Sequence, residues 1–206
     1  MSVKPFNLPE IQADLQSPEE NTRSRAMDRL AVEVKTNPGI RETALAIFRA
    51  TIQNPRDIYA TIHAAQGIEA IASPDESRQV WLALLNDPRP AMVKPAACLA
   101  RDRSFGPTLI ALLSKRQEPE VREVLVRALG RMREPAALGP MLECLADPAL
   151  RPHVVEALAD YNDSRGIPML IPLLQDKTPA WPVDNHGPML RVCDLAQDTI
   201  ERLRRS

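Results

Sequence analysis

The residues with the clearest chemical potential lie in the segment 176–189. Trp181, Asp184 and His186 stand close together there. An aromatic ring, a carboxylate and an imidazole in one loop could clamp a nucleic-acid base, a bilin or a peptide, and loops that interrupt regular scaffolds often carry function. The alternative is that Trp181 covers the end of the folded array while Asp184 helps to form a turn. We take these three residues as candidate partner-binding residues.

Two arginines recur at one position of a repeating pattern. Arg122 and Arg151 occupy the same place in successive repeats and could form a basic ladder that holds an acidic partner. Alternatively, each pairs with an acidic group of the neighbouring repeat. Because polar residues that recur in every repeat usually serve the interface between repeats, we expect this structural ladder. Arg78 and Lys115, on two other expected helices, are added as candidate partner-binding residues.

The sequence carries no pattern typical of a catalytic or metal site. His63 and His153 have no His, Cys or carboxylate at a repeating ligand spacing, so we expect packed or surface histidines and no metal. Cys98, Cys144 and Cys193 lack CxxC spacing and stand among Ala, Leu or Val, which indicates small core residues in a reducing compartment. GxSxG and glycine-rich phosphate loops are missing, and no cofactor is expected.

Composition narrows the class of protein. The chain has 206 residues with seven aromatic residues, seven glycines and twenty prolines, a mixture that disfavours sheets. It carries 26 basic and 27 acidic side chains, and residues 1–86 hold 9 and 11 of them, which leaves 17 and 16 for residues 87–206. Without a basic excess, nucleic acid and membrane surfaces are disfavoured as partners. The N-terminus lacks an apolar leader and no run is long enough to span a membrane, so we expect a cytoplasmic protein.

Self-similarity runs along the chain. A triplet of a small, a large and a small residue recurs with centres 28, 30 and 29 residues apart, and an apolar residue follows each centre after thirteen positions. The triplets are Ala70–Ala72, Cys98–Ala100, Ala128–Gly130 and Ala157–Ala159. A second word, x-Pro-x-Leu, ends at Leu109, Leu142 and Leu170, and Met141 and Met169 within it are expected to pack in the core. These spacings predict two helices in each repeat.

Proline marks the expected helix starts. It follows Ser, Asn, Asp or Glu at eight places, where the polar residue can cap and proline can take the first helical position. Ser17-x-x-Glu20 and Ser73-x-x-Glu76 have the form of capping boxes. Together with the apolar period, these starts predict helices over 9–15, 18–36, 38–52, 55–72, 74–85, 88–101, 105–115, 118–132, 135–145, 148–161, 166–175 and 188–204.

The two ends depart from the inner period, as the outermost units of a stack must when they present one polar face. We therefore expect a single domain, 1–206, with an N-terminal capping unit at 1–54, regular repeats at 55–175, and a loop plus a capping helix at 176–206. The loop has three prolines and no apolar period, so no helix is expected there.

The repeats resemble a known family. Val121-Arg122 followed by Ala128-Leu129-Gly130, and Leu150-Arg151 followed by Ala157-Leu158-Ala159, look like the short HEAT repeats of bacterial proteins, the type first named from phycobilisome lyases. Met92 replaces the arginine in one repeat, and Pro90 and Pro95 flank it, so its helix is expected to kink or to start late. The resemblance implies an all-α, right-handed α-solenoid whose second helices line a concave side.

The resemblance implies a function only coarsely, because fold does not fix function. HEAT arrays mostly bind other proteins, so we expect a non-enzymatic, monomeric adaptor or scaffold that binds another protein through the concave face and the 176–189 loop. Two alternatives stay open: a bilin lyase or isomerase subunit of the phycobilisome-lyase type, and a HEAT-like nucleic-acid binder or DNA glycosylase.

Overall fold

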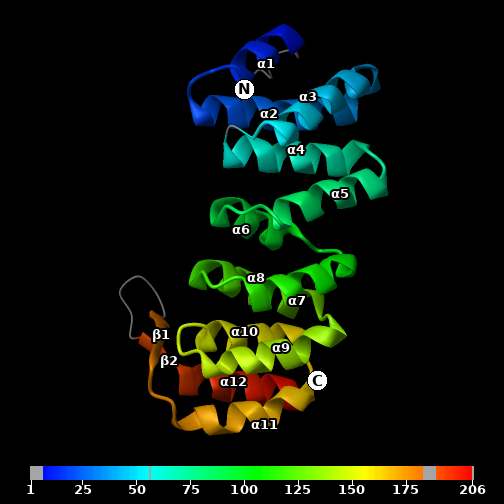
Figure 1. Cartoon of the computed structure of the whole chain (residues 1–206). Coiled ribbons are helices and arrows are strands. Elements are labelled where there is room, and N and C mark those ends of the chain that lie inside the picture. The colour runs from blue at the N-terminus through cyan, green and yellow to red at the C-terminus, as the bar shows by residue number, and fades with distance from the viewer. Residues whose placement is uncertain (1–6, 56, 183–188, 206) are drawn as a thin grey trace. The chain divides into compact units, whose positions relative to one another are not determined.

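The computed structural model describes residues 7–55, 57–182 and 189–205, apart from the side chains of residues 181 and 182. The chain forms two compact units, Met1–Asn86 and Asp87–Ser206, each built from successive helix pairs joined by short turns (Figure 1). The predicted all-α solenoid class is confirmed. Of the helices described, none is both long and apolar enough to cross a membrane.

The first unit packs its helices around Phe48, which is fully buried. A Cβ on Gly67 would clash with the Phe48 ring, so α4 approaches α3 closely only because residue 67 is glycine. Trp81 is 2% exposed and belongs to the hydrophobic core. The elements are α1 (Leu8–Leu15), α2 (Glu20–Thr36), a 3₁₀ turn (Pro38–Ile40), α3 (Arg41–Gln53), α4 (Ile58–Ile71) and α5 (Pro74–Leu85).

The second unit stacks its first helices, α6 on α8, α8 on α10 and α10 on α12 (Figure 1). Its helices are α6 (Pro90–Leu99), α7 (Gly106–Lys115), α8 (Pro119–Met132), α9 (Leu138–Glu143), α10 (Arg151–Tyr161), α11 (Ile167–Leu170) and α12 (Val192–Arg205). Short 3₁₀ segments accompany the second helices, namely η2 (Arg103–Phe105), η3 (Pro135–Ala137), η4 (Cys144–Ala146), η5 (Ser164–Gly166) and η6 (Ile171–Gln175).

Several helices begin later than predicted. α2, α4, α6 and α10 start three or four residues after Ser17, Asn54, Asp87 and Asp147. The side chains of Ser17, Asp87 and Asp147 accept a hydrogen bond from the backbone N–H two residues later, which makes a tight turn before the helix. The prediction of a capping box at Ser17 is therefore wrong. At Ser73 the hydroxyl caps α5 as predicted, since it accepts from Glu76 N at 3.2 Å.

The triplet places its residues at the tightest point of the stack. Leu129 is fully buried, as its register predicted. Beside it, a Cβ on Gly130 would stand 2.6 Å from the carbonyl oxygen of Ala157. The backbones of α8 and α10 thus come together over glycine and alanine, while leucine fills the space between them.

The second helices depart from the predicted register. α9 begins at Leu138, so Pro140 is its third residue, whereas the proline is the second residue in α7 and α11. This shift by one residue buries Met141, as expected, and leaves Leu142 only half-buried. Met169 is 48% exposed, contrary to the prediction, and Ile171 is 51% exposed. In this last repeat α11 and η6 pack mainly against α12, and the chain turns into a 3₁₀ helix at residue 171.

The cysteines are free thiols in three different environments. Cys144 is buried and Cys193 is half-buried, but Cys98 is exposed, so its predicted place in the core is wrong. The helical period of α6 turns Met92, Val93 and Ala96 inward and leaves residue 98 on the opposite face.

A hairpin was not predicted. β1 (Pro179–Pro182) pairs antiparallel with β2 (Met189–Arg191), with Pro179 opposite Arg191 and an irregular register between Pro179 and Pro182. The helix expected from residue 188 consequently begins at Val192. Four and three residues are too short for alternation to reveal a strand.

The close approach at Gly130 leads to a prediction. Gly130→Ala should lower the free energy of unfolding by about 1–3 kcal/mol, because the added methyl group must push α10 away from α8. The matched control is Gly139→Ala, since a Cβ there would meet nothing within 4 Å. Urea unfolding of both variants checks this, and equal stabilities would contradict the proposed packing.

Candidate functional site

The sequence-predicted site falls on the hairpin segment, residues 176–191, which leaves the second unit between η6 and α12 (Figure 1). The backbone of Trp181 belongs to β1. Asp184 and His186 lie outside the described residues, as does the side chain of Trp181. Their grouping into one binding site therefore stays a prediction. The contacts described below hold the two legs of the hairpin segment, residues 176–182 and 189–191.

Asp176 anchors the first leg of the hairpin segment. Its carboxylate accepts from the Arg151 guanidinium at 2.5 Å and from the Thr178 N–H at 2.9 Å. Its backbone carbonyl accepts from the N–H of Cys193 at 2.8 Å, and the Thr178 carbonyl accepts from the N–H of Val192 at 3.0 Å. The hydrogen bonds from Thr178, together with Arg151, lower the pKa of the Asp176 carboxyl, so the anchor is ionised at neutral pH.

Asp194 holds the second leg. Arg191 donates to the two carboxylate oxygens of Asp194 through Nε and Nη2, both at 2.9 Å, and its backbone N–H donates at 3.1 Å. These bonds lower the pKa of Asp194 to about 2. The carboxylate lies in the first turn of α12, so it both caps that helix and fixes the strand that precedes it.

A groove of about 530 Å³ lies at the base of the hairpin segment, between η6 and α12. Its apolar lining includes Ile171 and Leu174, which are 51% and 37% exposed. Lys177, Arg191 and Arg204 provide positive charge around it, and Asp194 and Glu201 provide negative charge. Apolar side chains beside charges of both signs suit a peptide side chain better than a single small ion.

The two ladder arginines each contact the repeat that follows. Their partners are acidic residues 25 positions further along the chain, and a third pair in the first unit has the same form. The pairs are Arg23–Asp57 at 2.7 Å, Arg122–Asp147 at 2.8 Å and Arg151–Asp176 at 2.5 Å. Sequence reasoning missed Arg23, although it stands seven residues before Leu30, the same distance as Arg122 before Leu129.

In α6, where the ladder arginine is missing, an arginine from another helix donates hydrogen bonds to the turn that precedes the helix. Met92 stands at the ladder position of α6 and is fully buried. Arg116, from the end of α7, donates instead to the carbonyls of Asp87 and Pro88 at 3.2 and 3.3 Å and pairs with Glu118 at 2.9 Å. That these arginines fix the stacking of the repeats stays a prediction.

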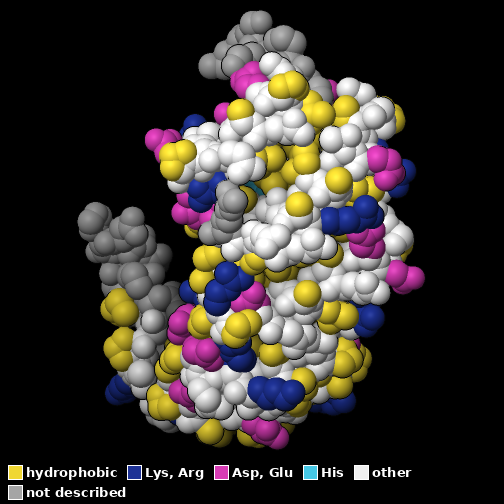
Figure 2. Space-filling model, turned by 45° about the horizontal axis from the view of Figure 1, so that its top comes forward, with side chains coloured by type: hydrophobic (Ala, Val, Ile, Leu, Met, Phe, Trp, Pro, Cys, Tyr) yellow, Lys and Arg dark blue, Asp and Glu magenta, His cyan; other side chains and the backbone are white. Residues whose placement is uncertain are grey.

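The other candidate residues are dispersed. Arg78 is exposed on α5 of the first unit, and Lys115 is exposed at the end of α7 in the second. They belong to different units, and their role in partner binding stays a prediction. The face in Figure 2 has basic and acidic side chains interspersed, which agrees with the balanced composition.

The buried thiol of Cys144 and the histidines do not have the geometry of a catalytic or metal centre in the described part of the chain. Burial raises the pKa of the Cys144 thiol, so it is protonated at neutral pH and a weak nucleophile. His63 faces Asp28 at 3.9 Å, and His153 lies 3.6 Å from Glu123 and 3.1 Å from Arg127. Nowhere in the described ranges do three His, Cys, Asp or Glu side chains gather as ligands would.

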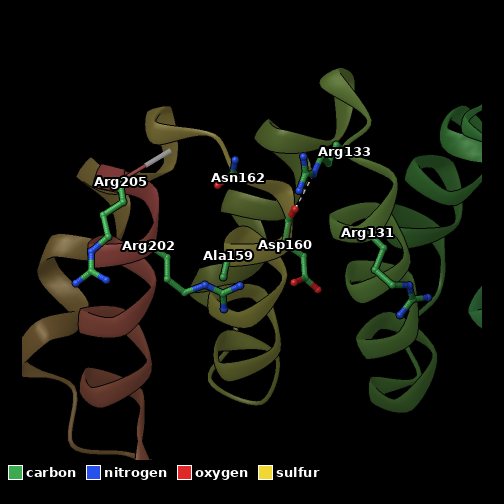
Figure 3. Close-up of a pocket in the computed structure, with 7 residues that line it drawn as sticks. All are labelled: Arg131, Arg133, Ala159, Asp160, Asn162, Arg202 and Arg205. Atoms are coloured by element: carbon green, nitrogen blue, oxygen red, sulfur yellow. Dashed lines mark hydrogen bonds between the residues drawn. The ribbon is translucent and has the colours of Figure 1, made fainter.

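Sequence reasoning missed a basic pocket at the C-terminal ends of α8, α10 and α12 (Figure 3). It measures about 720 Å³ and is lined by Arg131, Arg133, Ala159, Asp160, Asn162, Arg202 and Arg205. A signal was present in the sequence, because Arg101 and Arg131 each stand two residues after a triplet centre, and Arg202 stands two residues after the equivalent position of α12. Sequence reasoning missed this signal because basic and acidic side chains are balanced over each half of the chain.

The anchoring of the hairpin segment leads to a prediction. Arg151→Met should raise amide exchange at Val192 and Cys193 by about tenfold, the effect of losing about 1.4 kcal/mol of local stability. The matched control is Arg122→Met, which removes the ladder pair one repeat earlier. Hydrogen exchange read by mass spectrometry checks both variants, and equal protection of these amides in the two would contradict the anchoring role of Arg151.

His153 leads to a prediction about pH. Burial lowers the pKa of His153 below its usual value of 6.5; Glu123 opposes this shift and Arg127 reinforces it. The unfolded chain then binds a proton more readily than the folded protein below about pH 6.5, so stability falls as the pH drops through this range. His153→Gln should flatten this part of the profile. Urea unfolding between about pH 5 and pH 8 measures it, and parallel profiles for both proteins would refute the assignment.

Comparison with known proteins identifies the repeats. Residues 106–183 match the family described as HEAT repeats. Among solved structures, the chain is similar to the YibA protein of Escherichia coli, with 19% identity over 95% of this chain and 67% of that one and a TM-score of 0.61. It is also similar to an engineered protein, with 18% identity over 98% and 100% of the two chains and a TM-score of 0.52. No curated protein matches the sequence.

These likenesses establish the repeat fold. The HEAT-repeat match covers the elements from α7 to β1. The structural similarities extend the repeat fold to nearly the whole chain. The expected HEAT-type repeat is therefore confirmed over residues 106–183, and the comparisons do not address the phycobilisome-lyase subtype.

Proposed function

We propose that this HEAT-repeat chain is a non-enzymatic scaffold that binds another protein through its hairpin segment and the second helices beside it. One observation carries the proposal: the hairpin segment extends from the repeats with both legs tied down, at Asp176 and at Asp194. Repeat arrays provide extended and rigid binding surfaces, and an anchored projection adds a specific contact to such a surface.

The hairpin segment has the composition of an interface anchor. Trp181 stands between Ala180 and Pro182, with Pro179 close by, so the backbone around the aromatic residue has little freedom to lose on binding. Tryptophan in such a setting often contributes much of the binding energy of an interface. We take Asp184 and His186 as its polar companions.

Exposed apolar side chains next to the hairpin segment support the proposal. Met169 and Ile171 on α11 and η6 are 48% and 51% exposed, and Met189 on β2 is 49% exposed. Flexible thioethers adapt to different partner surfaces. These exposed apolar side chains stand within 12 residues of Trp181 in the sequence, and Ile171 also lines the groove at the hairpin base, which suits a protein partner.

The proposal includes the finer expectations from the sequence. We take the second helices, together with Arg78 and Lys115, as further contacts to the partner. We also take the protein as a cytoplasmic monomer of bacterial type. No specific observation favours the bilin lyase or the glycosylase alternative over protein binding.

Trp181→Ala is the decisive variant. It should weaken partner binding by about 2 kcal/mol or more and shift the melting temperature little, because an interface anchor is not part of the folded core. The matched control is Tyr59→Ala, which removes a 63% exposed aromatic side chain of the first unit. Affinity capture from the native cell identifies the partner, and calorimetry with the purified partner then measures both variants.

Two results would count against this proposal. If Trp181→Ala unfolds the protein, Trp181 is a core residue that caps the array, and nothing singles out the hairpin segment as the partner-binding site. If Tyr59→Ala weakens binding as much as Trp181→Ala, the partner does not select the hairpin segment.

A further inference from the structure

One sequence position at the basic pocket recurs with the repeat. Two residues after each triplet centre, or after the equivalent Ile200 in α12, the second unit has Arg101, Arg131, Asp160 and Arg202, all of them exposed. The residues at this position lie at the C-terminal ends of successive first helices. The ladder described above follows the N-terminal ends of the same helices, so the two sets of arginines belong to opposite ends of the stack.

The local charge differs sharply from that of the unit. Residues 87–206 carry 17 basic and 16 acidic side chains, yet four arginines and only one carboxylate, Asp160, line the pocket. Because the pocket is open to solvent, its arginines attract an anionic ligand without the cost of burying a free charge.

Structural roles account for only part of these arginines. Arg133 donates through Nε to the Asp160 carbonyl at 2.9 Å, and Arg131 donates to the Cys98 carbonyl at 3.3 Å. Each uses one of the five donors that a guanidinium has. Arg205 reaches Glu201 only at 3.4 Å. Among the residues that the structure describes, Arg202 has neither a hydrogen-bond partner nor an ion-pair partner.

The backbone at the pocket has an uncommon feature. Arg133 and Asn162 end α8 and α10 at equivalent positions, and both adopt the left-handed conformation, with φ of 52° and 59°. Glycine is the usual residue at such a helix end, and asparagine is tolerated there. An arginine at this position is strained, and strained residues cluster at functional sites.

We infer that this pocket binds an acidic peptide segment, rich in Asp and Glu, of the partner protein. This inference rests on the proposed protein-binding function and names the chemistry of the partner. Figure 3 shows the four guanidinium groups spread across the ends of the three helices instead of converging on one point. Separate guanidinium groups suit several carboxylates along a segment better than one phosphate, and each planar fork matches a carboxylate. The amide of Asn162 is available for the peptide backbone.

The size of the basic surface favours a peptide over nucleic acid. Nucleic-acid sites neutralise many phosphates along a backbone, and their affinity depends on that number. Here four arginines surround a single carboxylate, and Asp163 pairs with Arg165 next to Asn162. Such a short basic stretch holds a few carboxylates, not an extended polyanion.

The test uses the full chain and a fluorescently labelled peptide rich in Glu and Asp, beside the same peptide with Gln and Asn. Fluorescence anisotropy at low ionic strength, where screening is weak, should show binding of the acidic peptide only. Arg202→Gln should raise its Kd by about fivefold to tenfold, and Arg131→Gln with Arg202→Gln should raise it further. The matched control is Arg25→Gln, which removes the same charge from an exposed arginine of the first unit.

A second measurement does not depend on the variants. In the wild-type protein, phenylglyoxal modifies accessible arginines, and mass spectrometry locates them; the acidic peptide should protect Arg202 and leave Arg25 reactive. The inference is overturned if both peptides bind equally, if Arg25→Gln weakens binding as much as Arg202→Gln, or if an oligonucleotide binds the pocket more tightly than the peptide.

The two proposals fail in different ways. If the natural partner binds, is sensitive to Trp181→Ala and is insensitive to Arg202→Gln, the pocket is not its site while the scaffold proposal stands. If the acidic peptide binds at Arg202 but its addition leaves capture of every protein partner unchanged, the peptide does not represent a partner and the inference about the pocket is wrong.

Discussion

The close contact between successive first helices sets the geometry of the second unit. α8 and α10 approach until the carbonyl of Ala157 fills the space that a Cβ on Gly130 would need. This spacing lets one arginine side chain reach from a repeat to the next, as Arg122 does to Asp147 at one end and Arg133 does to Asp160 at the other. A wider stack would separate both sets of partners, so the polar contacts depend on the small residues of the triplet.

The arginines at the two ends of these helices have different consequences. At the N-terminal ends, the ladder arginines are half-buried and end on carboxylates, so their charge is used within the fold. At the C-terminal ends, Arg131 and Arg133 bind neutral carbonyls and therefore keep their positive charge. Positive charge there is favoured by the helix dipoles, and it remains available to an outside anion.

Much of the fold could be predicted from the sequence because its signals are local. The triplet, the capping serine at Ser73 and the helical period each act over a few residues, and they predicted the helices within a few positions. The hairpin was missed because its strands are too short to alternate, and the Pro140 shift was missed because one residue does not change an apolar period. The basic pocket was missed because its arginines are near one another only after α8, α10 and α12 stack.

The reach of these arginines also bears on how the chain acquires its structure. The Thr199 hydroxyl donates to the Val155 carbonyl, 44 positions earlier in the chain, and the ladder pairs span 25 to 34 positions. Bonds of this range close short loops, which costs little chain entropy and favours rapid folding. Each repeat needs only the one before it as a template, so the protein can fold in order from its first helices while the ribosome is still synthesising the last.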